Sequence, residues 1–235
     1  MNRRRFLAFD IETAKLLPEG VGDLLAHRPL GICCAAAHAL DSGETLSWHG
    51  TGAGGPAPRL SREEARSLVA DLVRLTADGY TLVTWNGAAF DFPILAEESG
   101  ATAECAALAA AHVDMMFQVV CSQGHRLALQ KAALGMSLPG KASGVSGADA
   151  PRLWAAGEHE QVLAYCRQDV KLTAELADAC ERAAALRWLT QRGKPTSMPL
   201  PRGWLSVSEA ERLPEPDTSW MSSPPSRREM LAWMR

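Results

Sequence analysis

The stretch FDIET, residues 9–13, places two carboxylates inside a run that otherwise has the composition of a buried strand. Successive side chains of a strand point to opposite faces, so Asp10 and Glu12 project together while Ile11 points the other way. Two like charges this close repel each other and lose hydration, and something has to offset that cost. A divalent cation does so, and we therefore expect a metal site here. An exposed edge strand that tolerates both acids is the alternative.

The overall composition is that of a globular protein with a substantial core. The chain has 235 residues, of which 47% are hydrophobic and 22% charged, and its length predicts one sizeable domain with an appendage or a small second domain. The net charge of -3 argues against a protein that holds duplex nucleic acid by charge alone. An enzyme whose metal ions supply local positive charge is compatible with it.

The cysteines and the apolar runs bear on the cellular compartment. The six cysteines form no CxxC pair and have no zinc-ligand spacing, so we interpret them as reduced thiols. The start MNRRRFLAF resembles the basic opening of a signal peptide, but Asp10 and Glu12 interrupt its apolar run. Since no later stretch has the length and apolar character of a membrane span, we expect a cytoplasmic protein that does not enter a membrane.

Hydrophobic periodicity predicts an α/β protein with a mixed sheet flanked by helices. Ser61 and Glu64 form a capping box at the start of a helix that ends at Gly79. The expected strands are residues 5–12, 31–40, 44–50 and 81–86. The other expected helices end at Gly100 or cover residues 101–111, 113–121, 127–134 and about 159–190, and residues 135–149 form a Gly/Ser-rich loop.

The composition changes at Lys194. Seven of the 14 prolines follow it, together with Trp204, Trp220 and Trp233. Proline excludes long regular elements, and tryptophan argues against a solvated linker. We therefore expect a domain at residues 1–193 and an irregular C-terminal extension at 194–235 that packs on the domain or on a protein partner.

Two further segments carry acids at positions that suit a shared site. WNGAAFDFPIL, residues 85–95, places Asp91 after a strand, where a helix-capping role is the alternative. YCRQDVKLT, residues 165–173, places Tyr165 and Asp169 on one helix face, where a solvated surface pair is the alternative. Four carboxylates and a tyrosine together suit two Mg²⁺ or Mn²⁺ ions that promote phosphodiester hydrolysis. Lys141, in the loop, either contacts substrate phosphates or is a solvated charge.

The segments FDIET, NGAAFD and YCRQD resemble the three motifs of the DEDDy 3′–5′ exonucleases of the DnaQ-like superfamily, which has a ribonuclease H-like fold. The resemblance covers residues 5 to 190 and is closest to stand-alone relatives of the proofreading domain of family-B DNA polymerases. It implies a five-stranded mixed sheet. A histidine five residues before Asp169 would indicate the other subclass, but that position is Ala164.

The resemblance also implies roles for individual residues. Tyr165 would orient or help to deprotonate the attacking water. Thr13, Asn86 and Phe90 would position the terminal nucleotide. The metal-binding carboxylates would be Asp10, Glu12, Asp91 and Asp169.

The implied reaction removes nucleoside 5′-monophosphates from a free 3′ end, and we favour single-stranded DNA as substrate. An RNA-processing 3′–5′ exoribonuclease with the same chemistry is the alternative, because no residue decides between DNA and RNA. A non-catalytic nucleic-acid-binding scaffold is disfavoured, since all five motif positions are present.

Overall fold

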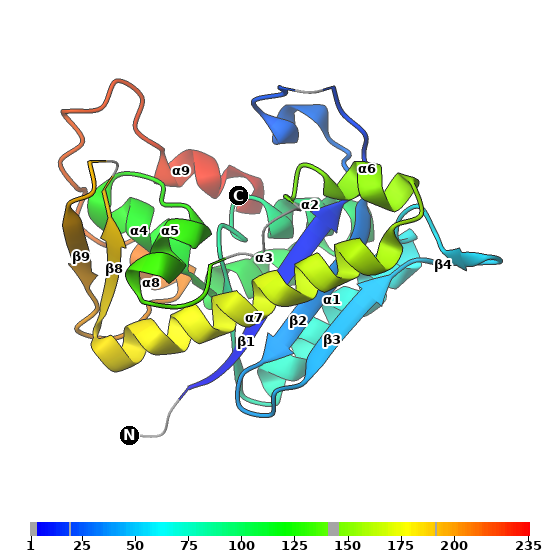
Figure 1. Ribbon diagram of the computed structural model, residues 1–235, viewed down its shortest axis with the longest axis horizontal. Coiled ribbons are helices and arrows are strands. Elements are labelled where there is room, and N and C mark those ends of the chain that lie inside the picture. Colours follow the sequence, from blue (N-terminus) through cyan, green and yellow to red (C-terminus); the bar gives the residue numbers. More distant parts are fainter. Residues whose placement is uncertain (1–3, 19, 141–145, 191) are drawn as a thin grey trace.

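A five-stranded mixed sheet forms the centre of the protein (Figure 1). The computed structural model describes residues 4–18, 20–140, 146–190 and 192–235. The strand order in the sheet is β3-β2-β1-β6-β7. The pairs β1–β2 and β2–β3 are antiparallel, and the pairs β1–β6 and β6–β7 are parallel. The fold class expected from the sequence is therefore confirmed. The strands are β1 (Arg5–Thr13), β2 (Ile32–Ala39), β3 (Thr45–His49), β6 (Tyr80–Thr84) and β7 (Val113–Asp114).

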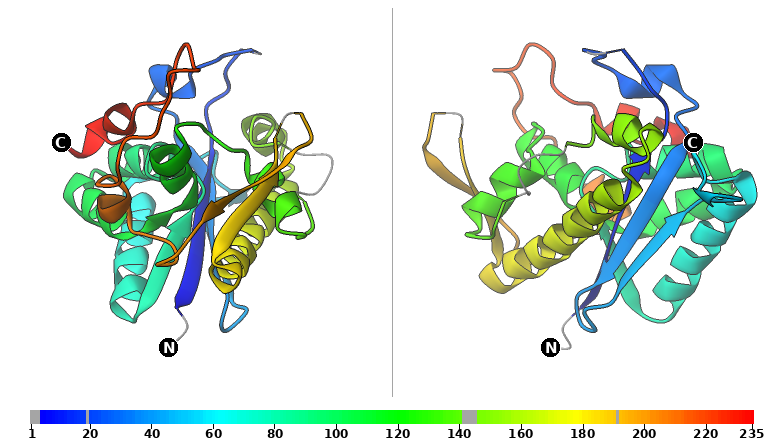
Figure 2. Two further views of the ribbon diagram at one scale, coloured as in Figure 1. Left: turned by 90° about the vertical axis from the view of Figure 1, so that its left-hand side faces the viewer. Right: turned by 45° about the vertical axis from the view of Figure 1, so that its right-hand side comes forward.

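The central strand β1 is covered on both faces (Figure 2). Leu7 and Phe9 belong to a core shared with α1 (Arg62–Ala77), α2 (Asp91–Ser99) and α3 (Thr102–Ala111). Phe6 and Ala8 belong to a core on the other face, where α7 (His159–Ala183) packs on β1 and β2. Since β1 is the central strand, the alternative of an exposed edge strand does not apply to Asp10 and Glu12.

The first long helix begins as its sequence predicts. The Ser61 hydroxyl accepts from the backbone N–H of Glu64, and the Glu64 carboxylate accepts from the backbone N–H of Ser61. Leu68 and Leu72 of α1 are fully buried, and Gly79 follows the helix with a φ of +91°. The capping box is thus confirmed.

Two predicted helices are wrong at one end. Residues 113–121 were expected to be helical, but Val113 and Asp114 form β7, and α4 (Met115–Gln123) follows. The helix expected over 159–190 ends at Ala183, because Ala184 adopts a left-handed conformation and residues 185–189 form β8 (Ala185–Leu189). Alanine, leucine and arginine favour helix, yet pairing with β9 (Pro195–Pro199) buries the side chains of Leu186 and Trp188. Tertiary packing therefore overrides local propensity.

The remaining elements are short. The helix α6 begins at Ala150, directly after the segment 135–149 that was expected to be irregular. These elements are η1 (Leu24–His27), β4 (Thr51–Gly52), β5 (Gly55–Pro56), α5 (Leu129–Gly135), α6 (Ala150–Ala155), α8 (Val207–Ala210), α9 (Arg227–Met230) and η2 (Ala232–Met234).

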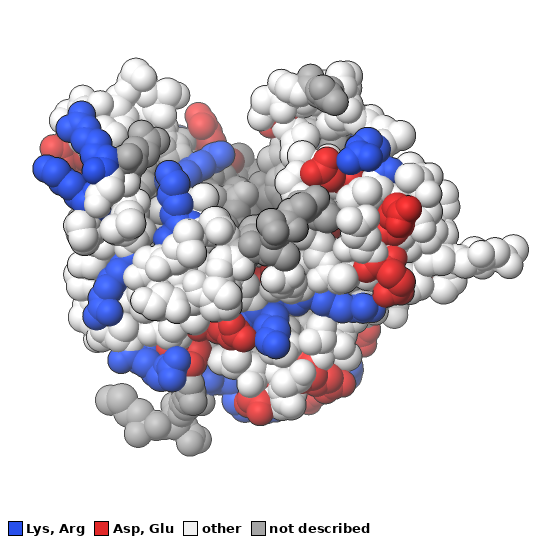
Figure 3. Space-filling view, viewed as in Figure 1, with Lys and Arg blue, Asp and Glu red and all other residues white. Residues whose placement is uncertain are grey.

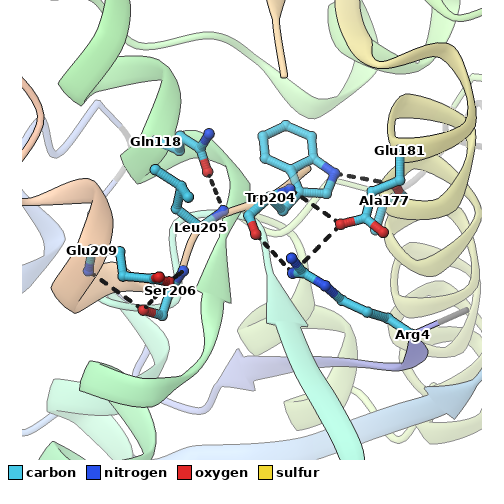
Figure 4. Close-up of polar contacts among 8 residues, drawn as sticks. All are labelled: Arg4, Gln118, Ala177, Glu181, Trp204, Leu205, Ser206 and Glu209. Carbon is cyan, nitrogen blue, oxygen red and sulfur yellow. Dashed lines mark hydrogen bonds and ion pairs between the residues drawn. The ribbon is translucent and has the colours of Figure 1, made fainter. Parts of the chain in front are cut away.

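The C-terminal extension packs on the domain through Trp204, which is fully buried (Figure 4). Its indole N–H donates to the carbonyl of Ala177 at 3.0 Å, and its backbone N–H donates to Glu181 at 3.1 Å, both on α7. Arg4 donates to the Trp204 carbonyl at 2.7 Å. The boundary expected between residues 193 and 194 falls in the connection between β8 and β9.

The last residues of the chain also lie against the domain. The indole N–H of Trp233 donates to the carbonyl of Ala88 at 2.7 Å, and Met230 and Leu231 are buried against α4. The guanidinium of Arg227 donates to the carbonyls of Cys121 and of neighbouring tail residues. Of the two surroundings expected for the extension, it therefore packs on the domain. No helix in the described ranges is both long and apolar enough to cross a membrane.

Candidate active site

A cleft of about 310 Å³ opens at the carboxyl end of β1. It lies where β1, α7 and the turn before α2 meet, and the backbone of residues 147–148 borders it. It brings together six of the residues that the sequence singles out, and these are Asp10, Glu12, Thr13, Phe90, Tyr165 and Asp169.

Strand alternation directs Asp10 and Glu12 to the face of β1 that α7 covers. The pairing of β1 with β2 shifts its register between Glu12 and Thr13, and such irregularities re-aim side chains near the ends of strands. The Sγ atom of Cys166 and one carboxylate oxygen each of Asp10 and Glu12 lie within 4.8 Å of one another. The two acids of FDIET therefore converge with a thiol from α7.

The helix α7 contributes Tyr165 and Asp169 from one face, and both side chains are buried, with 8% and 5% of their surface exposed. The alternative of a solvated surface pair is thereby excluded. Between these two residues in sequence, Cys166 also faces the acids. A hydrogen bond with Cys34 lowers the pKa of its thiol, but burial and the nearby acids have the larger combined effect and raise that pKa to about 12. The acids that raise it are Asp10, Glu12 and Asp169.

Asp91 does not line the cleft. It begins α2, only 2% of its surface is exposed, and its Oδ1 accepts from the backbone N–H of Ile11 at 3.0 Å. Burial raises its pKa to about 7, although hydrogen bonds from Asp10 and from the backbone of Ile11 act in the opposite direction. Asp91 thus joins the carboxylate cluster through its hydrogen bond with Asp10.

The turn from Asn86 to Phe90 sets the position of Asp91. Asn86 has a φ of 75°, and a Cβ atom on Gly87 would lie 2.5 Å from the hydroxyl of Thr84, so glycine is required there. Asp114 accepts from the backbone N–H groups of Asn86 and Ala88, and these hydrogen bonds hold the turn in place. Burial raises the pKa of Asp114.

Two residues predicted to contact the substrate, Asn86 and Lys141, are not among the described residues that line the cleft. Asn86 does not line the cleft, and its side-chain oxygen is buried without a hydrogen-bond partner among the residues that the structure describes. Lys141 lies outside the described residues. The sequence interpretation missed Cys166, Trp85 and Leu129; the signal for Cys166 was its position three residues before Asp169, on the same helix face.

The residues present fit divalent metal ions. Carboxylate oxygens of Asp10 and Glu12 lie within 4.8 Å of each other and of the Cys166 Sγ atom, and Asp169 raises the pKa of the same thiol. Hard cations such as Mg²⁺ and Mn²⁺ prefer oxygen donors of this kind, and nucleases with an RNase H-like fold use such ions. The carboxyl of Asp91, hydrogen-bonded to Asp10, has a raised pKa that a cation would lower again.

The fold and the acidic cleft define an RNase H-like α/β protein of the nuclease type. The chain belongs to the RNase H superfamily, whose profile matches residues 57–181. It is similar in structure to the family B DNA polymerase from the hyperthermophilic archaeon Pyrobaculum calidifontis, with a TM-score of 0.53 and 20% identity over 76% of this chain. The matched region spans 25% of that polymerase, and the likeness shows the fold. No curated protein matches the sequence.

Proposed function

We propose that the protein is a two-metal-ion 3′–5′ exonuclease of the DEDDy type. The observation that carries the proposal is the meeting of Asp10 and Glu12 on β1 with the buried Tyr165 and Asp169 on α7 in one cleft. Several carboxylates brought this close together repel one another and lose hydration, and bound metal ions would offset that cost.

Each group has a role in this proposal. Asp10, Glu12, Asp91 and Asp169 would hold the metal ions. Mg²⁺ or Mn²⁺, when bound, supplies an acidified water and stabilises the charge of the leaving oxygen. The hydroxyl of Tyr165 orients the attacking water by hydrogen bonding, as its position on the cleft wall allows.

Apolar groups on the cleft wall support a substrate with an unpaired terminal base. Trp85, Phe90 and Leu129 line the cleft beside the acids, and aromatic side chains stack on bases of any sequence. Thr13, at the end of β1, and Asn86, in the turn before α2, would contact the terminal nucleotide. We favour single-stranded DNA; the exoribonuclease alternative shares every one of these groups.

The test is hydrolysis of 5′-labelled single-stranded DNA and RNA with Mg²⁺, with Mn²⁺ and with chelator. We expect a ladder that shortens from the 3′ end, requires metal and disappears in Asp169→Asn. Glu175→Gln, on the same helix but outside the cleft lining, is the matched control and retains activity. A wild-type protein that binds Mn²⁺ and cleaves neither polymer would contradict the proposal.

Tyr165→Phe separates positioning from metal binding. It removes only the hydroxyl, so we expect kcat to fall roughly 10–100-fold while KM and Mn²⁺ affinity stay unchanged. Tyr80→Phe is the control, because Tyr80 is the other of the two tyrosines and packs under Arg5 at the far end of β1. Equal rates for Tyr165→Phe and the wild type would remove the tyrosine from the mechanism.

A further inference from the structure

A basic face lies beside the cleft, although the chain as a whole is acidic. Residues 122–140 and 184–203 contain no aspartate or glutamate. They form α5 and the β8–β9 hairpin, which pack against each other. Lys and Arg side chains lie on this side of the molecule, at the left of Figure 3. The Lys and Arg residues of the two ranges are Arg126, Lys131, Arg187, Arg192, Lys194 and Arg202. We call the surface that carries the first five of them the basic face.

The close fit between α5 and β8 places these charges on a continuous surface. A Cβ atom on Gly135 would lie 2.1 Å from the carbonyl of Arg187, so only glycine allows this approach. Lys131 lies one turn before Gly135 on the same side of α5, and both Lys131 and Arg187 are exposed. A groove of about 310 Å³ beside Arg187 is also lined by the hydroxyl-bearing Thr196 and Ser197.

The charged side chains of the basic face form no ion pairs within the described ranges. Among the residues that the structure describes, no ion pair involves Arg126, Lys131 or Arg187, nor Arg192 or Lys194. Arginines elsewhere on the surface do have such partners, as Arg74 and Arg152 show. A surface of this kind attracts a polyanion.

The basic face begins at the cleft itself. Leu129, the first residue of α5, lines the cleft, and the indole N–H of Trp85 donates to the carbonyl of Leu127 just before it. A strand that leaves the cleft along α5 therefore reaches Lys131 within one helical turn and Arg187 beyond it.

An aromatic row lies on the same side. The ring of Trp220 contacts that of His125 at a centroid distance of 6.4 Å, and His125 contacts Trp188 of β8 at 6.0 Å. Trp220 is 66% exposed although its ring is large and apolar. Trp188 is buried and supports the row from beneath, so Trp220 is the ring open to a ligand. An exposed ring among basic groups binds single-stranded nucleic acid, because a base stacks on the ring while the cations contact phosphates.

We propose that the basic face binds the nucleic-acid strand upstream of its 3′ end, so that the protein engages a single strand several nucleotides longer than the cleft holds. The direction of the strand rests on the proposed exonuclease function. Binding of the strand to the face does not require hydrolysis. An acidic protein segment is the competing occupant; it lacks bases that could stack on Trp220.

The test compares two charge reversals of equal size. Lys131→Glu/Arg187→Glu alters the basic face, and Arg62→Glu/Arg66→Glu alters exposed residues of α1, which packs against α2, α3 and β6. Binding of a fluorescein-labelled oligothymidylate of about 20 nucleotides is measured in chelator at several salt concentrations. Hydrolysis of the p-nitrophenyl ester of thymidine 5′-monophosphate with Mn²⁺ reports on the cleft alone.

We expect Lys131→Glu/Arg187→Glu to weaken oligonucleotide binding at least tenfold and to reduce the salt slope by about 1.4, the value for two phosphate contacts to a single strand. Hydrolysis of the small ester stays unchanged, and the α1 variant behaves as the wild type in both assays. Trp220→Ala weakens binding roughly tenfold, and Trp220→Phe retains it. Lys131→Gln/Arg187→Gln gives a smaller loss in the same direction.

Three results would overturn the inference: equal losses in the two charge-reversal variants, unchanged oligonucleotide binding in Lys131→Glu/Arg187→Glu, or displacement of the oligonucleotide by polyglutamate of equal charge. Failure of the exonuclease proposal has a different signature. In that case the wild type hydrolyses no substrate, while the oligonucleotide still binds and still responds to the basic-face substitutions.

Discussion

At the scale of single residues, Asp91 is the carboxylate that the fold buries most deeply among the four proposed metal ligands. The peptide N–H of Ile11 fixes one of its oxygens, so its position depends on the backbone of FDIET. Burial raises its pKa to about 7, which means that the metal-free fold favours its neutral form. Burial therefore makes the ionised form of Asp91 unfavourable, and it also keeps the carboxyl within hydrogen-bonding distance of Asp10.

The raised pKa of Asp91 predicts a pH-dependent stability in chelator. A carboxyl whose pKa is about 7 when folded and about 3.9 when unfolded holds its proton more tightly in the folded state. Its contribution therefore costs nothing below pH 4 and lowers the free energy of unfolding progressively as pH rises towards 7. Asp91→Asn lacks this loss. We expect its melting temperature to exceed that of the wild type by several degrees at pH 8 and by less at pH 5.

His112 has the opposite effect on the pH dependence of stability. Burial lowers its pKa to about 4, so its contribution lowers the free energy of unfolding as pH drops below 6.5. It is present in both proteins, so the difference between the two melting temperatures isolates Asp91. Mn²⁺ should raise the melting temperature of the wild type more than that of Asp91→Asn. A difference that is constant from pH 5 to pH 8 would show that Asp91 is charged in the metal-free fold.

At the scale of elements, local signals predicted those parts whose neighbours in sequence are also their partners in structure. The strand β1 pairs with β2 and β6, which are distant in sequence, and was predicted from the alternation of its own side chains. The capping box of α1, between Ser61 and Glu64, is of the local kind. The strand β8 is not, because residues 185–189 become a strand only through pairing with β9, six residues or more along the chain. The two-residue strand β7 likewise exists through its contact with β6 and carries no periodicity of its own.

Ser61→Ala tests the capping box. Without the hydroxyl, the backbone N–H of Glu64 loses its acceptor, and we expect a loss of about 1 kcal/mol, or roughly 2–4 °C in melting temperature. Ser67→Ala, on the exposed side of the same helix, is the control and should leave stability unchanged or slightly higher, since alanine favours helix. Equal losses would mean that the cap contributes nothing specific. Thermal unfolding followed by circular dichroism gives both values.

At the scale of the whole molecule, the sequence motifs predicted which residues meet but not the surface around them. Asp10, Glu12, Tyr165 and Asp169 meet in the cleft because β1 and α7 pack face to face. The net charge of -3 concealed the basic face, since charge summed over a chain carries no information on its distribution in space. The change of composition at Lys194 likewise did not reveal that Trp204 enters the main core.

The burial of Trp204 predicts that the extension at 194–235 unfolds together with the domain. Its indole fills the space beside Ala177, and its backbone is bonded to Arg4 and Glu181, so the tail is connected to both the first strand and the longest helix (Figure 4). Trp204→Ala removes a fully buried ring, and we expect a loss of about 3–5 kcal/mol in one cooperative transition. Trp220→Ala removes the same ring from an exposed position of the same tail and should cost less than about 0.5 kcal/mol. Both variants are unfolded in urea, and the transition is followed by circular dichroism and by proteolysis of the tail. If Trp204→Ala exposed the tail to protease while the rest of the domain kept its urea midpoint, the extension would be a separate unit bounded near residue 193.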